Sequence, residues 1–211
     1  MTAQFDRAFW EAHWQEGRDA ANVLPAHPVL EAEIAALEPG TALDAGSGEG
    51  AEALWLARRG WDVTAADISR EALARAGARE TTKTPPIAWV EADLTTWQPP
   101  QRFDLVTTFY AHPTIPQLAF YARIAEWVAP GGTLLIVGHH RTQGPGHAHG
   151  YAYPESAVVD PVSIQALLAP GLWSVRTADV RDRAVAGRSG GTMLLSDVIV
   201  RAIRPGRQNQ P

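Results

Sequence analysis

The sequence predicts a three-layer αβα fold built around a mostly parallel sheet. Apolar runs typical of strands alternate with helical patterns through most of the chain, as in parallel α/β proteins. The run at 103–109 is almost continuously apolar, which is typical of a strand buried on both faces. A glycine-rich turn, LDAGSGEG at Leu43 to Gly50, follows the first apolar run, at the edge where such sheets bind ligands.

The alternating elements are placed by their patterns and by the residues that begin and end them. Ser69 is a helix N-cap with Glu71 in the first turn, and Gly60 stands where a C-terminal cap belongs. Pro130-Gly131-Gly132 is a turn. Strands are therefore expected over 42–43, 62–67, 87–90, 103–109 and 133–138, and helices over 49–59, 69–78 and 116–128.

The last third of the chain departs from this alternation. A short helix is expected over 163–168, followed by strands over 173–181 and 192–201. The segment between these strands, RAVAGRSGG at 183–191, is expected to be a long, flexible linker. Two successive strands with no helix between them predict an antiparallel hairpin at the edge of the sheet.

Three parts of the chain are expected. Residues 1–40 form an N-terminal helical lid or brace, because Phe5, Phe9, Trp10 and Trp14 recur at helical spacing. Residues 41–203 form the α/β domain, and residues 204–211 a disordered tail, so that the chain is a single domain overall. The stretch from 139 to 160 has no clear periodicity and is expected to be a mobile substrate loop.

Composition narrows the class of protein. The chain has 211 residues, a formal net charge of -5 and no cysteines. The acidic balance gives no general attraction to nucleic acid or to an anionic membrane, and the absence of cysteine excludes disulfides, thiolate metal sites and a cysteine nucleophile. No signal peptide or apolar run of about 18 residues is visible, so a cytoplasmic location is expected.

The glycine turn fits more than one nucleotide-like cofactor. Gly46-x-Gly48-x-x-Ala51 satisfies the fingerprint of dinucleotide-binding proteins, with Asp67 near the position of a ribose-binding acid. However, three successive strands end in Asp44, Asp67 and Asp93, which are expected to line one rim of the sheet. Carboxylates at this rim repel a pyrophosphate and suit a cationic ligand.

Five motifs together resemble the class I S-adenosylmethionine-dependent methyltransferases: LDAGSGEG, VTAADIS, EADL, FDLVTTF and APGGTLLIV. The resemblance covers roughly residues 37–201. It implies the Rossmann-like methyltransferase fold, with seven strands in the order 3-2-1-4-5-7-6 and strand seven antiparallel. The N-terminal FWEAHWQEG and the following N-x-x-L-P-x-H-P-V-L are similar to small-molecule methyltransferases of the thiopurine, thiol and tellurite type, where an N-terminal segment covers the cofactor.

The resemblance implies a set of cofactor-binding residues. At the glycine turn these are Asp44, Ala45, Gly46, Ser47 and Gly48; after the second and third strands Asp67, Ile68, Asp93 and Leu94; after the fourth Thr108 and Phe109; and from the N-terminal segment Trp14. Asp67 would accept from the ribose hydroxyls and Asp93 from the adenine amino group. Alternatives remain for four of them: helix or turn caps for Asp67 and Asp93, a surface turn for Asp44, and core packing for Trp14.

Candidates for catalysis follow the fourth and fifth strands. They are Tyr110, His112, His139 and His140. His112 could act as a base or orient the acceptor, or could be a structural histidine. Because strand side chains alternate, only one of His139 and His140 is expected to face the ligand. No metal is predicted, because the spacing of His139, His140, His147 and His149 matches no metal signature. In the same loop, Tyr151 and Tyr153 could line an acceptor pocket or anchor the loop.

The sequence therefore predicts an S-adenosylmethionine-dependent methyltransferase that acts on a small molecule, as a monomer or homodimer. The alternatives are a nicotinamide- or flavin-dependent oxidoreductase and a non-catalytic protein that binds S-adenosylmethionine. RNA as the acceptor is disfavoured, because the sequence has no basic stripe and no N-P-P-Y-type motif after strand four. The acceptor atom stays open among sulfur, selenium, oxygen, nitrogen and carbon.

Overall fold

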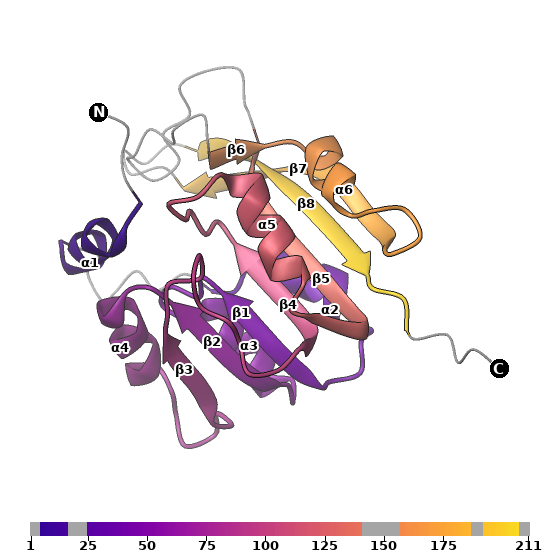
Figure 1. Cartoon of the computed structure of the whole chain (residues 1–211). Coiled ribbons are helices and arrows are strands. Elements are labelled where there is room, and N and C mark those ends of the chain that lie inside the picture. The colour runs from indigo at the N-terminus through magenta and orange to yellow at the C-terminus, as the bar shows by residue number, and fades with distance from the viewer. Residues whose placement is uncertain (1–4, 17–24, 141–156, 187–191, 207–211) are drawn as a thin grey trace.

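One mixed sheet with helices on both faces dominates the computed structural model, which describes residues 5–16, 25–140, 157–186 and 192–206 (Figure 1). The strands are β1 (Thr41–Ala45), β2 (Asp62–Asp67), β3 (Ile87–Glu91), β4 (Phe103–Phe109), β5 (Val128–His140), β6 (Val158–Val159), β7 (Ser174–Ala186) and β8 (Thr192–Ile203). The helices are α1 (Arg7–Gln15), α2 (Pro28–Ile34), α3 (Ala51–Arg58), α4 (Arg70–Ala78), α5 (Gln117–Ala125) and α6 (Pro161–Leu167).

The strand order confirms the predicted fold. The main path is β3-β2-β1-β4-β5-β8-β7, with β3 to β5 parallel and β8 antiparallel to both β5 and β7. The expected edge hairpin is therefore present. Among the described residues the sheet has eight strands, one more than expected. The additional strand is the two-residue β6, which pairs in parallel with the end of β5 at His139 and His140.

Two predicted boundaries are wrong, and long-range pairing explains both. The segment 183–186, expected in the flexible linker, belongs to β7, where Arg183 pairs with Leu195 and Ala186 with Thr192. The helix expected over 116–128 ends at Ala125, because Val128 already pairs with Phe103 and begins β5. The expected Pro-Gly-Gly turn becomes an irregularity inside that strand.

Successive side chains of each central strand point to opposite faces, so two apolar cores form. One core joins α2 and α3 to the sheet through residues such as Leu105 and Leu135. The other joins α5 and α6 to the sheet through Val106 and Leu134. The sheet is thus covered on both faces, as the mostly apolar central strand β4 leads one to expect.

Helix α2 also binds the C-terminal hairpin through a buried carboxylate. Glu33 accepts hydrogen bonds from Thr177 Oγ1 and Arg181 Nη2, each at 2.7 Å. Arg201 lies close to the same carboxylate, with Nε 3.7 Å from Oε2. These contacts fix the segment before β1 against β7 and β8. Within the described part of the chain, no helix is long and apolar enough to cross a membrane.

Candidate functional site

The turn between β1 and α3 requires glycine at several positions. Gly46, Gly48 and Gly50 have φ angles of 82°, 51° and 72°, in the left-handed region that disfavours other residues. A Cβ atom on Gly46 would lie 2.4 Å from the Cβ of Ala111, and one on Gly50 would lie 2.5 Å from the ring of Trp89. The backbone of the turn is therefore in close contact with the segment after β4.

Four backbone N–H groups of this turn are used within the protein. Gly46 and Ser47 both donate to the Ala66 carbonyl, at 2.8 and 3.1 Å. Gly48 donates to Asp67 Oδ2 at 2.8 Å, and Gly50 donates to the Ser47 carbonyl at 2.8 Å. A pyrophosphate site needs such N–H groups directed at the ligand. This turn therefore fits a dinucleotide poorly, although its sequence satisfies the fingerprint.

Asp44 is a buried carboxylate at the end of β1. Its side chain is 1% exposed, Oδ1 accepts from Thr107 Oγ1 at 3.2 Å, and Oδ2 has no hydrogen-bond partner among the described residues. Burial raises the pKa of Asp44 well above its ordinary value, and the nearby Glu52 raises it further. A buried carboxylate with an unsatisfied oxygen favours a cationic partner, so this site fits an ammonium group.

Glu52, in the first turn of α3, is a member of the site that the sequence analysis did not identify. Its Oε1 accepts from the backbone N–H of His27 at 2.9 Å, and burial raises its pKa. In sequence, an acidic residue in a first helical turn indicates only a favourable interaction with the helix dipole. Its proximity to Asp44 follows from the packing of α3 against β1.

Asp67 combines the two roles that the sequence left open. Its Oδ1 accepts from Ser69 N at 2.9 Å, before α4, and its Oδ2 accepts from Gly48 N at 2.8 Å. Burial raises its pKa, and these backbone hydrogen bonds oppose the rise. Asp93 is half-buried and forms a turn in which Oδ1 accepts from Thr95 N at 2.9 Å and from Thr95 Oγ1 at 2.6 Å.

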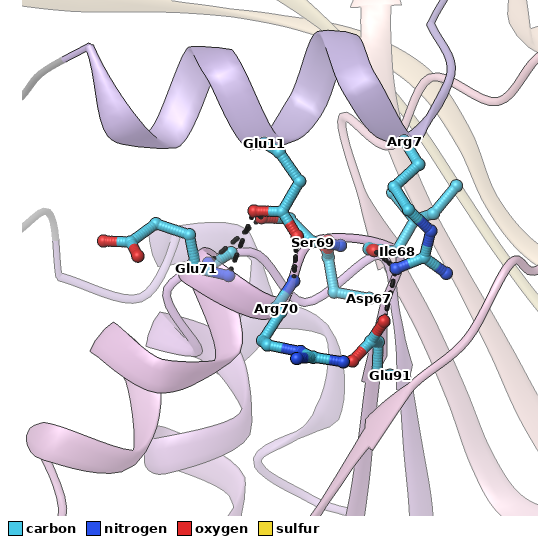
Figure 2. A network of polar contacts seen from close by, with 9 residues as sticks. Arg7, Glu11, Asp67, Ile68, Ser69, Arg70, Glu71 and Glu91 are labelled. Atoms are coloured by element: carbon cyan, nitrogen blue, oxygen red, sulfur yellow. Dashed lines mark hydrogen bonds and ion pairs between the residues drawn. The ribbon is translucent and has the colours of Figure 1, made fainter.

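Helix α1 lies across the end of β2 and the start of α4 (Figure 2). Glu11 accepts from Arg70 N at 2.8 Å and from Ser69 Oγ at 3.1 Å. Arg7 donates to the Ile68 carbonyl at 2.7 Å and pairs with Glu91. Local sequence could not indicate these contacts, because their partners are more than fifty positions apart.

Two aromatic residues of α1 extend this contact toward the glycine turn. A Cβ atom on Gly48 would lie 3.2 Å from the ring of Trp14, so the indole stands directly against the turn. Trp10 Nε1 donates to the His112 carbonyl at 3.2 Å. Helix α1 therefore contacts the segment after β2, the glycine turn and the segment after β4.

The other predicted cofactor residues differ in how far their side chains reach the turn. Thr108 is fully buried and donates from Oγ1 to the Ala45 carbonyl at 2.8 Å, so it contacts the β1 backbone. Phe109 packs on the ring of His27, with centroids 5.8 Å apart. Ala45 and Leu94 belong to the core beside α5.

Three of the four candidates for catalysis form a stack of rings. His139 stacks on Tyr110 with centroids 4.5 Å apart and on His112 with centroids 5.3 Å apart. His140, the next residue of β5, points to the other side of the strand, because strand side chains alternate. Tyr110 is the one residue other than glycine with a positive φ, 54°, among those described.

Burial lowers the pKa of His112 to about 4, and a side-chain hydrogen bond with Gln117 opposes this shift. The imidazole is therefore neutral at pH 7 and keeps a lone pair, which a base or an orienting acceptor of hydrogen bonds needs. No cluster of three potential metal ligands occurs in the described parts of the chain. His147, His149, Tyr151 and Tyr153 lie outside the described residues.

Comparison with known families and proteins agrees with this geometry. A family model described as a methyltransferase domain matches residues 42–132. Uncharacterized methyltransferases of Mycobacterium tuberculosis and Mycobacterium bovis are 40% identical over 97 residues, which is 45% of this chain and 48% of theirs. The match therefore spans about half the length of these relatives.

Solved structures match most of the chain. One matching structure was solved in a study of the conversion of a disulfide bond into a thioacetal group during echinomycin biosynthesis. Its TM-score is 0.71 and its identity 22%, and the match covers 96% of this chain and 94% of that protein. Magnesium protoporphyrin IX methyltransferase from Synechocystis PCC 6803, with bound S-adenosylhomocysteine, has a TM-score of 0.62 and 19% identity over 97% and 90% of the two chains. At these identities the likeness shows a common fold.

Proposed function

We propose that this chain, whose residues 42–132 match a methyltransferase domain, is a class I, S-adenosylmethionine-dependent methyltransferase that methylates a small-molecule acceptor. The observation that carries the proposal is the buried Oδ2 of Asp44, which has no partner among the described residues. This oxygen stands beside a glycine turn in which the N–H groups of Gly46, Ser47, Gly48 and Gly50 are bonded internally. A ligand with a cationic amine satisfies it, and a phosphate does not.

Residues on three strand ends would hold the cofactor. Asp44 would face its ammonium group, and Gly46 and Gly48 leave room for its chain. Asp67, already fixed by two backbone N–H groups, has lone pairs left for the ribose hydroxyls. Asp93 would accept from the adenine amino group, with Ile68 and Leu94 on either side. Ser47 adds a buried hydroxyl that has no hydrogen-bond partner among the described residues.

When bound, the cofactor would supply an activated methyl group on its sulfonium, for in-line displacement by the acceptor with S-adenosylhomocysteine as the leaving group. The chain's own task is to align the acceptor and to keep water out. Helix α1 covers the end of β2 and places Trp14 against the glycine turn. His112, neutral at pH 7, would orient the acceptor or take its proton.

A small acceptor is favoured over a macromolecule. The net charge of -5 gives no field for RNA. A structural neighbour is named for magnesium protoporphyrin IX, a small acceptor, and another for 1,6-didemethyltoxoflavin. The ring of His112 lies close to Trp10 of α1 and to Phe5, which precedes that helix, with ring centroids 6.4 and 5.3 Å apart.

Titration calorimetry with S-adenosylmethionine, S-adenosylhomocysteine and NADH tests the cofactor assignment. We expect binding of the first two and none of NADH. Binding of NADH without S-adenosylmethionine would instead support the oxidoreductase. A screen of small thiols, phenols, amines and oxyanions, read by release of S-adenosylhomocysteine, then tests catalysis. Cofactor binding with no turnover of any acceptor would leave the non-catalytic alternative standing.

A further inference from the structure

Tyr110, directly after β4, is held in a conformation that its side chain disfavours. Its φ of 54° is in the left-handed region. A residue other than glycine is strained there, and such a conformation persists only where surrounding contacts impose it. The backbone N–H of Tyr110 donates to the Val137 carbonyl at 3.0 Å, which fixes one side of the residue. The phenol fixes the other side.

The Tyr110 hydroxyl contacts two side chains from distant parts of the chain. His27 Nε2 lies 3.2 Å from it, and Arg183 Nη2 donates to it at 3.3 Å. His27 precedes α2 and Arg183 lies on β7. Burial raises the pKa of the phenol, which therefore stays neutral. A neutral phenol between two donors acts as an anchor for the turn.

Asp197 on β8 joins these two side chains. It is 2% exposed, and its Oδ2 accepts from Arg183 Nε at 2.5 Å and from His27 Nε2 at 3.2 Å. Burial raises the pKa of Asp197, but hydrogen bonds with His27, Tyr110 and Arg183 outweigh this and hold it below its ordinary value. The carboxylate is therefore ionised and orients both donors toward the phenol.

The start of α2 sets which nitrogen of His27 carries the proton. Nδ1 accepts from the backbone N–H of Val29 at 3.2 Å, as the N-cap of the helix. In the neutral ring, the proton is then on Nε2, directed at Asp197 and Tyr110. The four side chains His27, Tyr110, Arg183 and Asp197 are hereafter called the Tyr110 clamp.

The clamp acts on the turn that touches the cofactor site. The Cβ of Ala111 stands where a side chain on Gly46 would be, 2.4 Å from the ideal Cβ position. The Ala111 carbonyl accepts from Gln117 Nε2 at 2.9 Å. A shift of Tyr110 out of its left-handed conformation would therefore move Ala111 and His112 relative to Gly46.

We propose that Asp197 is a positioning residue for methyl transfer: through Arg183 and His27 it holds Tyr110 in its left-handed conformation, and thereby holds Ala111 against the cofactor-binding turn and fixes the position of the adjacent His112. The inference rests on the proposed function only in that the Gly46 turn binds S-adenosylmethionine. Tyr110 lies within the stretch 42–132 that matches the methyltransferase domain, whereas His27, Arg183 and Asp197 lie outside it.

A double-mutant cycle tests the clamp. Tyr110→Phe removes only the hydroxyl, and Asp197→Asn removes the charge that orients the donors. Each single variant is expected to weaken S-adenosylhomocysteine binding, measured by calorimetry, by roughly 5- to 30-fold. The double variant is expected to bind S-adenosylhomocysteine as tightly as the weaker-binding single variant does, because both changes remove the same restraint. Fully additive losses would contradict the proposal.

Glu33→Gln is the matched control. Glu33 is also a buried carboxylate that joins α2 to the hairpin, through Thr177 and Arg181. The Glu33→Gln variant should have a lower melting temperature than the wild type, as Asp197→Asn should, but its affinity for S-adenosylhomocysteine should be unchanged. If Asp197→Asn and Tyr110→Phe both keep wild-type affinity and turnover while losing stability like Glu33→Gln, the clamp is structural only and the proposal is wrong.

A measurement without ligand separates this inference from the proposed function. The methyl resonance of Ala111 in alanine-labelled protein should shift in Tyr110→Phe and in Asp197→Asn, and stay in place in Glu33→Gln. An unmoved resonance in the first two would overturn the clamp. Failure of the wild type to bind S-adenosylhomocysteine would instead overturn the proposed function, while the resonance still reports on the turn. Should Asp197→Asn not fold, Tyr110→Phe alone decides.

Discussion

Gly48 donates its backbone N–H to Asp67 Oδ2 at 2.8 Å, and this hydrogen bond ties the glycine turn after β1 to the end of β2. The other oxygen of the same carboxylate accepts from Ser69 N at 2.9 Å, before α4. Asp67 therefore both builds the turn and occupies the position where a ribose would bind. The cap and the ligand contact are compatible roles of one side chain, since each oxygen has two lone pairs.

Asp67→Ala should weaken binding of S-adenosylhomocysteine by on the order of 1.5–3 kcal/mol, the range for hydrogen bonds to a charged group. Calorimetry measures the change. Asp62→Ala, at the exposed start of the same strand, removes the same charge and should bind normally. Equal affinities in both variants would mean that Asp67 serves only as a cap.

Gly46→Ala should abolish detectable cofactor binding, because the new Cβ would lie 2.4 Å from that of Ala111 and the turn must move. Gly131→Ala is the control: its φ of 86° is similar to the 82° of Gly46, but nothing lies within 4 Å of an added Cβ. Both variants carry the backbone strain of about 1–3 kcal/mol, read by thermal unfolding. A loss of binding in both would assign the effect to strain alone.

His112→Ala should lower turnover much more than cofactor affinity, because the ring lies beyond the glycine turn, beside α1 and His139. General acid–base contributions are typically a hundredfold or more, on the order of 10²–10⁴. The two readouts are kcat with any acceptor found by screening and the dissociation constant of S-adenosylhomocysteine. Wild-type turnover would make His112 a structural histidine.

The buried His112 should also make the protein less stable in acid. Its folded-state pKa of about 4 is below the ordinary 6.5, so the unfolded chain takes up the proton first as the pH falls. Stability present above pH 6.5 is then lost progressively toward pH 4, by up to about 3 kcal/mol. Asp44 and Glu52, whose pKa values are raised, act with the opposite sign. The comparison is therefore between wild type and His112→Gln, whose unfolding free energies should converge as the pH falls to 4.

Glu11→Ala should weaken cofactor binding and loosen α1, because Glu11 accepts from the backbone at the start of α4. A loss of a helix-capping acceptor costs about 0.5–2 kcal/mol. Glu16→Ala, at the exposed end of the same helix, is matched in charge and helix propensity and should have little effect. Identical cofactor affinities for the two variants would show that α1 does not contribute to the site.

Much of the fold could be predicted from local patterns. Alternating apolar strands and amphipathic helices have periods of 2 and about 3.6 residues, and these identified β2, β4, α3 and α4 closely. Boundaries that depend on a distant partner were missed. Arg183 was predicted to lie in a linker, but it pairs with Leu195 and belongs to β7. Val128 was predicted to be helical, but it pairs with Phe103 and belongs to β5.

The sequence by itself determined the glycine turn and the acidic residues at the ends of β1 and β2 and just after β3, because each of these features is a local pattern in the chain. Only the tertiary structure decided that the N–H groups of the turn are used internally, which separates a cationic ligand from a pyrophosphate. It alone brought Glu52 close to Asp44 and joined His27, Arg183 and Asp197 around Tyr110. The physical reason is that buried polar groups are satisfied by whichever partner the packing brings near, and a local pattern carries no record of that partner.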